Sequence, residues 1–212
     1  MSLWDVAILF LSIFHTIASQ CIDGVHNVIT VDSYGSGKLP VRIRNITILV
    51  YDIHYRPSCH KGKVNVLLPG YFHIISGEVV TPRDFDLFES NLVRATVHLG
   101  STKICHNGES GMIIIPSRLC QFDIKTVIPP DMCRILQSKG THTLKEMQDK
   151  LNFNSTLELP PSPSFLGITL LDLLKGEYFI KISIDSDHKQ IAEFAMPSGF
   201  KALEMGLSED DD

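Results

Sequence analysis

Residues 161–196 read PSPSFLGITLLDLLKGEYFIKISIDSDHKQIAEFAM, and the second half of this stretch decides the fold class. There the apolar side chains take alternate positions, at Tyr178, Ile180, Ile182 and Ile184. An alternation with a period of two predicts a strand with one buried face. Turn-forming residues follow at 185–188, and a second strand then places three apolar side chains on one face, namely Ala192, Phe194 and Met196. We therefore expect an antiparallel hairpin.

The first half of the stretch is apolar without a clear period. It holds Phe165, Leu166, Leu170 and Leu171, and it follows three prolines at positions 160, 161 and 163. Prolines lack the N–H donor that a sheet ladder needs, so they keep this segment out of a regular strand. Such a segment either fills a core or lines an apolar opening, and the residues themselves leave both readings open.

The rest of the chain reads as short strands separated by turn residues, with few helix signals. A helix is expected at 143–151, where Leu144, Met147 and Leu151 share one face, and a further helical turn is expected near Leu170–Leu174. No repeat or linker divides the chain. The prediction is an all-β fold, an antiparallel β-sandwich or β-cup with one or two short helical segments, over residues 20–200.

The two ends differ in composition from this domain. Residues 1–19 contain the apolar run 6–14 followed by small residues, which predicts a secretory signal peptide; the alternative is a buried N-terminal helix or strand. Residues 201–212 are predicted to form an acidic, disordered tail rather than a binding device. Two sequons, at Asn45 and Asn154, predict glycosylation in a secreted protein. We expect a protein that is secreted or delivered to the lysosomal lumen.

Composition and motifs argue against several functions. The formal charge is −5 and no run is strongly basic, so no nucleic-acid partner is expected. Sequence signatures of hydrolases, metalloproteases and nucleotide-binding proteins are missing, and we expect no enzyme, no catalytic residue and no cofactor. A metal site at His54, His60 and His73, or a carboxylate pair among Asp84, Asp86 and Glu89, is less favoured than ordinary surface roles.

Five cysteines fit an oxidising compartment, and their odd number leaves at least one outside intramolecular disulfides. Cys105 and Cys120 bracket a turn and a short apolar run that can bring them together. A bridge between them would close a loop of about 15 residues and stabilise the fold by about 3 kcal/mol. Spacing alone leaves the pairing of Cys21, Cys59 and Cys133 open.

Several short segments together resemble a known family. They are Thr102–Cys105, Pro116–Phe122, Lys139–Leu144, Leu157–Pro160, Gly176–Ile180 and Lys189–Ile191. In this order they are similar to the ganglioside activator branch of the ML lipid-recognition superfamily, over about Val41 to Met196. The chain also departs from that pattern. The last strand holds no cysteine to pair with Cys21, a further cysteine is replaced near Lys125, and the apolar segment 165–174 is longer.

The resemblance implies a β-cup whose two sheets open an apolar cavity for a lipid acyl chain. It implies an entrance formed by Phe165, Leu166, Leu170 and Leu171, and a cavity wall formed by Tyr178, Ile180, Ile182, Met112 and Ile114. It also implies the Cys105–Cys120 disulfide. The expected partners are a lipid (a glycolipid, phospholipid or sterol), a membrane surface in transient contact, and a lysosomal hydrolase to which the lipid is presented.

A second hypothesis is a secreted β-sandwich that acts as an interaction module or receptor co-factor and carries no lipid. The same apolar residues would then fill a closed core. A continuous apolar cavity that opens near Phe165 favours the first hypothesis, and a filled core favours the second.

Overall fold

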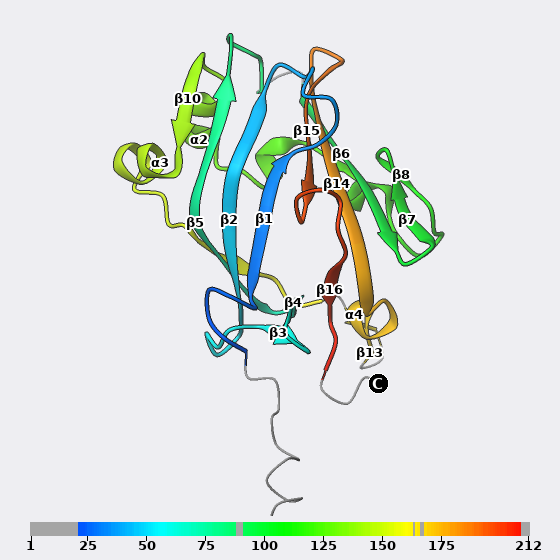
Figure 1. Cartoon of the computed structure of the whole chain (residues 1–212). Coiled ribbons are helices and arrows are strands. Elements are labelled where there is room, and N and C mark those ends of the chain that lie inside the picture. Colours follow the sequence, from blue (N-terminus) through cyan, green and yellow to red (C-terminus); the bar gives the residue numbers. More distant parts are fainter. Residues whose placement is uncertain (1–20, 88–90, 163, 166–167, 209–212) are drawn as a thin grey trace, which may run out of the picture.

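The computed structural model describes residues 21–87, 91–162, 164–165 and 168–208, and most of its strands belong to one strongly curled sheet (Figure 1). The predicted signal peptide at 1–19 lies outside the described residues. The curled sheet has two walls. We call them the first wall, built from the N-terminal half of the chain, and the second wall, built around the C-terminal hairpin.

The first wall is antiparallel and centres on the long pair β2–β5. In spatial order it contains β1 (Val28–Ser33), β2 (Arg42–Asp52) and β5 (Gly70–Thr81), and β5 is followed by both β10 (Gly140–Thr143) and β11 (Thr156–Leu159). Isoleucines and valines are frequent in β2 and β5, as expected for strands that pack on a core. This wall carries the cavity described below on its inner face.

The second wall centres on the predicted hairpin, which the structure confirms. It consists of β15 (Lys189–Met196), β14 (Gly176–Ser186), β6 (Asn91–Leu99), β7 (Thr102–His106), β8 (Glu109–Ser110) and β9 (Gln121–Phe122). The expected apolar partners face one another across β14 and β15, with Ile182 opposite Phe194 and Ile184 opposite Ala192. The turn uses Asp187 and His188 with positive φ angles of 50° and 59°.

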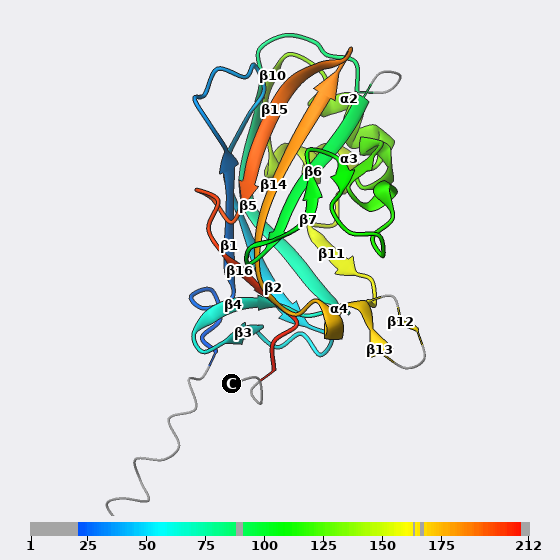
Figure 2. The ribbon, with the colours of Figure 1, turned by 90° about the vertical axis from the view of Figure 1, so that its right-hand side faces the viewer.

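The two walls join along one edge and separate along the other. Asp32 and Ser33 of β1 pair with Ala195 and Phe194 of β15, which makes the sheet continuous on that side. On the opposite side stand two helices, α2 (Pro130–Leu136) and α3 (Leu144–Leu151); α3 contacts β5 and β10, and Figure 2 shows both helices on the side of the molecule away from β1. The all-β cup with short helical segments is therefore confirmed.

The base of the cup is closed by short strands at the lower end of Figure 1. They are β3 (Cys59–His60), β4 (Lys63–Val66) and β16 (Leu203–Met205). β16 pairs antiparallel with β14 and parallel with β4, so the sheet is mixed rather than purely antiparallel. Near this end lie the two-stranded β12 (Ser164–Phe165) and β13 (Ile168–Thr169), and α4 (Leu170–Leu173), whose N-terminus is closed by a capping box at Thr169 and Asp172.

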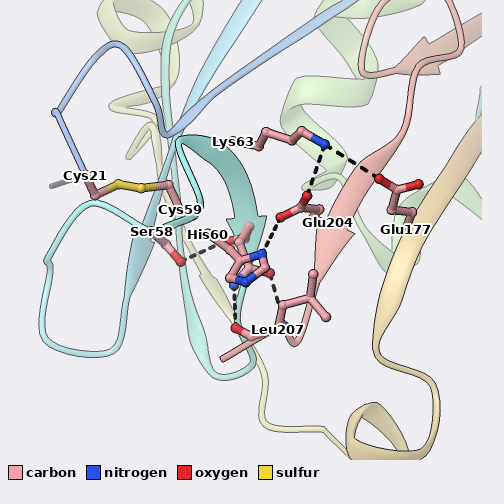
Figure 3. Close-up of polar contacts among 9 residues, drawn as sticks. Cys21, Ser58, Cys59, His60, Lys63, Glu177, Glu204 and Leu207 are labelled. Carbon is pink, nitrogen blue, oxygen red and sulfur yellow. Dashed lines mark hydrogen bonds and ion pairs between the residues drawn. A yellow bond between two sulfur atoms is a disulfide. The ribbon is translucent and has the colours of Figure 1, made fainter. Parts of the chain in front are cut away.

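The C-terminal strand corrects the predicted tail, because ordered structure continues beyond residue 201. Leu203 is 1% exposed and belongs to the core at the base, together with Val50 and Val66. Glu204 is buried beside His60, with 3.0 Å between His60 Nδ1 and Glu204 Oε2, and Lys63 Nζ lies 3.5 Å from Glu204 Oε1 (Figure 3). Three residues in an acidic segment lack a strand pattern, and only their pairing with β4 and β14 orders them.

Two disulfides reinforce opposite parts of the fold. Cys105 and Cys120 are bonded, as the resemblance implies, and close the loop that contains β8 and the short helix η1 (Ser117–Leu119). Cys21 is bonded to Cys59 at the base, a pairing that spacing left open (Figure 3). Cys133 of α2 is a free, fully buried thiol, and burial raises its pKa.

Candidate functional site

An apolar cavity of about 420 Å³ lies between the two walls of the cup, on the side where they separate. The first wall contributes Val31, Ile43, Ile46, Ile74 and Val79. The second wall contributes Ile184, Ile191, Ala192 and Phe194. The volume falls within the range of about 300–1,000 Å³ that is typical of small-molecule sites. The arrangement therefore provides an internal space suited to an apolar ligand.

Strand alternation explains why these side chains face the cavity. Ile43 of β2 lies opposite Val79 of β5, and both line the cavity, whereas their neighbours Arg42 and Arg44 are exposed. Successive side chains of a strand point to opposite faces, so one strand can present an apolar inner face and a charged outer face. The cavity is thus a continuation of the sheet's hydrophobic inner surface.

Helices α2 and α3 complete the cavity on the open side of the cup. Met132 and Leu136 of α2 line it, separated by four residues and therefore on one helical face. Leu144 and Met147 of α3 line it as well, as the shared face predicted for this helix suggests. The hydroxyl oxygen of Thr143 accepts a hydrogen bond from the N–H of Glu146 and so caps the start of α3. The two helices therefore close the cavity on the side where the two walls of the sheet separate.

Two large apolar side chains that line the cavity are also open to solvent, and they mark its mouth. Val127, which follows the short helix η2 (Ile124–Thr126), is 61% exposed. Leu157 of β11 is 41% exposed. Apolar side chains that are half exposed at the edge of an apolar cavity are unfavourable in water alone, since burial of such surface is worth about 25 cal/mol per Å². They are therefore available for contact with an apolar ligand.

The few polar side chains that line the cavity are held by partners in the protein. His142 is buried, with its Nε2 2.8 Å from the carbonyl oxygen of Ser138 and its Nδ1 3.2 Å from Glu146 Oε2. Glu146 also accepts a hydrogen bond of 2.7 Å from Lys150, and this bond, helped by His142, lowers the pKa of Glu146. Glu78 forms a half-exposed ion pair with Arg44. The lining is therefore apolar except for groups that are already paired.

Seven of the residues predicted to line the cavity or its entrance have side chains that the structure describes, and none of these seven contributes to the cavity. Met112, Leu170 and Ile182 come together, packed against the core around the Cys105–Cys120 disulfide, and Ile180 packs against the core at the base. Tyr178 is buried and donates its hydroxyl proton to the carbonyl oxygen of Leu174, and burial raises its pKa.

The remaining members of the set lie at the surface or near the base. Ile114 is 59% exposed, and Leu171 packs close to Gly206, where an added Cβ would lie 2.7 Å from its Cγ. Phe165 belongs to β12, and Leu166 lies outside the described residues. The cavity lies away from these residues because the two walls meet near the base, where Leu203 and Val66 fill the space. The walls separate only toward Ile184. The lipid contact predicted for these residues remains a prediction.

The structure also bears on the predicted glycosylation sites and on the question of a metal site or a membrane-spanning helix. Asn45 and Asn154 of the two sequons are both exposed. Within the described part of the chain, no group of three or more histidine, cysteine, aspartate or glutamate side chains is arranged to hold a metal ion. Among those same residues, no helix is long and apolar enough to cross a bilayer.

Comparison of the chain with models of known protein families and with curated proteins finds no match in either.

Proposed function

We propose that the protein binds a lipid by taking its apolar chain or ring system into the cavity between the two walls, and that it carries this lipid between membranes or presents it to a hydrolase. The observation that carries the proposal is the apolar cavity of about 420 Å³ with the exposed apolar mouth at Val127 and Leu157. A cup built only for stability would fill this space with side chains, because protein interiors are close-packed.

The energetics favour such a ligand. Each methylene group moved from water into an apolar site is worth about 0.8 kcal/mol, so a long acyl chain outweighs the cost of immobilising one molecule. The paired polar groups His142 and Glu146 offer little to a fully polar ligand, since breaking their hydrogen bonds leaves buried groups unsatisfied. The headgroup is expected to remain at the mouth, in contact with water.

Transient contact with a membrane is part of the proposal, and a second surface supports it. The loop closed by the Cys105–Cys120 disulfide carries Ile113, Ile114 and Leu119, which are 106%, 59% and 51% exposed. Three large apolar side chains exposed on one short loop are unusual for a surface that meets only water. The same loop holds Ile115 in the core, so the exposed residues are presented from a fixed base. The two disulfides agree with a secreted or lysosomal location.

A fluorescent-lipid transfer assay between vesicles tests the function. Ala192 is fully buried and lines the cavity, so Ala192→Phe places a ring where the lipid chain would lie. The exposed Ala202 gives the matched control, Ala202→Phe. We expect transfer by the wild type and the control and a loss of at least about tenfold in Ala192→Phe, equivalent to about 1.4 kcal/mol. Equal transfer by both variants would overturn the proposal, provided that both keep the wild-type circular dichroism spectrum.

A further inference from the structure

A second, basic groove lies on the outer surface of the first wall. It has a volume of about 370 Å³ and contains three cationic side chains, Lys38, Arg42 and Arg44. Its floor is apolar and consists of Leu39, Pro40, Val80 and Pro82. In a chain of formal charge −5, three cations around one groove are a local reversal of sign. The groove therefore differs in chemistry from both the cavity and the rest of the surface.

The charges of this groove are only partly compensated. Among the described residues, no carboxylate lies within ion-pair distance of Lys38 or Arg42; the guanidinium of Arg42 donates a hydrogen bond of 3.0 Å to the carbonyl oxygen of Gly37. Arg44 is paired with Glu78 at 3.4 Å, with both side chains partly exposed, and such surface pairs are weak. The groove thus keeps net positive charge and free donor groups.

The backbone of β2 and of the turn before it places the three cationic side chains around the same groove. Arg42 and Arg44 are two residues apart on β2, so both point to the outer face, and Arg42 lies opposite Val80 of the groove floor. Lys38 comes from the turn before β2, in which Gly37 has a φ of +65° that glycine adopts without strain. The hydrogen bond from Arg42 to Gly37 ties this turn to the strand. The site is therefore built from a strand and a fixed turn.

We propose that this groove binds an oxyanion, a phosphate or sulfate group, through Lys38, Arg42 and Arg44. Guanidinium forks match the geometry of phosphate oxygens, and a neighbouring ammonium adds a point charge. The apolar floor suits an anion that is carried on a less polar body, such as a lipid headgroup or an organic phosphate ester. The two sources share this chemistry, and the experiment below separates them.

The groove acts independently of the cavity. Ile43 and Val79 point into the cavity, whereas their neighbours Arg42 and Val80 line the groove, so the sheet itself separates the two sites. A ligand of the groove is therefore a second ligand rather than the headgroup of the first. Uptake of lipid into the cavity and binding of an anion to the groove can be measured, and can fail, separately.

The test compares Lys38→Gln/Arg42→Gln with a control of equal charge change, Lys145→Gln/Lys201→Gln, whose lysines are exposed outside the groove. In one arm, inorganic phosphate is titrated into the isotope-labelled full chain, and amide shifts are followed at residues 37–44. In the other arm, flotation is measured with vesicles of phosphatidylcholine alone and of equimolar phosphatidylcholine and phosphatidylserine. Lys38→Glu is added as a single variant, because Lys38 makes no hydrogen bond or ion pair with the described residues.

We expect phosphate to shift the groove amides in the wild type and the control but not in the groove variant. At about fivefold per basic residue near an anionic surface, binding to the anionic vesicles falls by about 25-fold in the groove variant. Loss of both responses identifies a membrane headgroup as the source, and loss of the phosphate response alone identifies a soluble phosphate ester. Groove variants, including Lys38→Glu, that match the control in both arms overturn the proposal.

Discussion

Nδ1 of His142 lies 3.2 Å from Oε2 of Glu146, and this contact joins β10 to α3 at the wall of the apolar cavity. The other ring nitrogen faces the carbonyl oxygen of Ser138 at 2.8 Å, so both nitrogens of His142 meet acceptors. Glu146 is shared between this ring and Lys150. The helix that closes the cavity is thus held to the sheet by a small charged network rather than by apolar packing alone.

The network predicts a loss of stability in acid that depends on Glu146. Its pKa in the folded protein is lowered, chiefly by the hydrogen bond from Lys150, so its contribution is present above the unfolded value of about 4.3 and is lost as the pH falls through the folded value. Glu146→Gln should lower the free energy of unfolding by about 1 kcal/mol at neutral pH and by much less at pH about 3. Urea unfolding at both pH values measures the difference. An equal effect at both would contradict this role, and Glu158→Gln, an exposed glutamate, is the control.

The mouth of the cavity predicts where an introduced charge blocks lipid transfer. Val127→Asp combined with Leu157→Asp places two carboxylates at two large apolar residues that are exposed and line the cavity. Transfer should fall by about tenfold or more, because a lipid chain must then pass charged groups. Ile53→Asp with Ile75→Asp, two exposed positions outside the cavity lining, is the matched control.

The same assay decides between this mouth and the entrance expected from sequence. Phe165→Asp with Leu166→Asp tests the apolar segment that follows the prolines. If this pair abolishes transfer and the Val127/Leu157 pair does not, the lipid enters elsewhere than at the mouth of the cavity. We expect the reverse order of effects, since Val127 and Leu157 line the cavity.

The two disulfides predict a ranking of stabilities. Their sequence separations are 15 residues for Cys105–Cys120 and 38 for Cys21–Cys59. In the chain-entropy model, replacing both cysteines of a pair by serine costs about 3 kcal/mol for the shorter loop and about 4 kcal/mol for the longer one. Urea unfolding of the two double variants measures both costs. A larger loss for the Cys105/Cys120 variant would contradict the ranking.

Strand β16 contains Leu203, a residue that composition places in a disordered tail, and its substitution should strongly reduce the stability of the fold. Leu203→Ala should lower the free energy of unfolding by about 3 kcal/mol, because Leu203 is 1% exposed within the core at the base. Lys201→Ala, at an exposed position two residues earlier, should change it by less than about 0.5 kcal/mol. Thermal or urea unfolding of the two variants is sufficient. Equal stabilities would mean that β16 does not belong to the folded core.

Sequence patterns predicted the strands and helices that carry a repeating pattern of apolar residues along the chain. The alternation at Tyr178–Ile184 identified β14 and its partner strand, and the spacing of Leu144 and Met147 identified the inner face of α3. Both signals repeat over two or more periods, so a single misplaced residue does not hide them. The fold class followed from these elements and from the many turn residues between short strands.

The position of the cavity depended on long-range packing that alternation does not report. Ile182 and Ile184 share one face of β14, yet Ile182 packs in core clusters and only Ile184 reaches the cavity. The difference arises from where the walls separate, which is set by β16 and by helix α2. β16 has three residues. Helix α2 has seven and begins at Pro130, directly after Pro129, so both elements lie below the length at which a pattern is distinctive.

Native mass spectrometry of the full chain, purified from a eukaryotic secretory host without detergent, tests the lipid-binding proposal most directly. The cavity of about 420 Å³ predicts one co-purifying lipid molecule per chain in the wild type and in Ala202→Phe, and none in Ala192→Phe. A wild-type protein that carries no lipid and takes up none from vesicles, or an Ala192→Phe variant that carries as much lipid as the wild type, would contradict it.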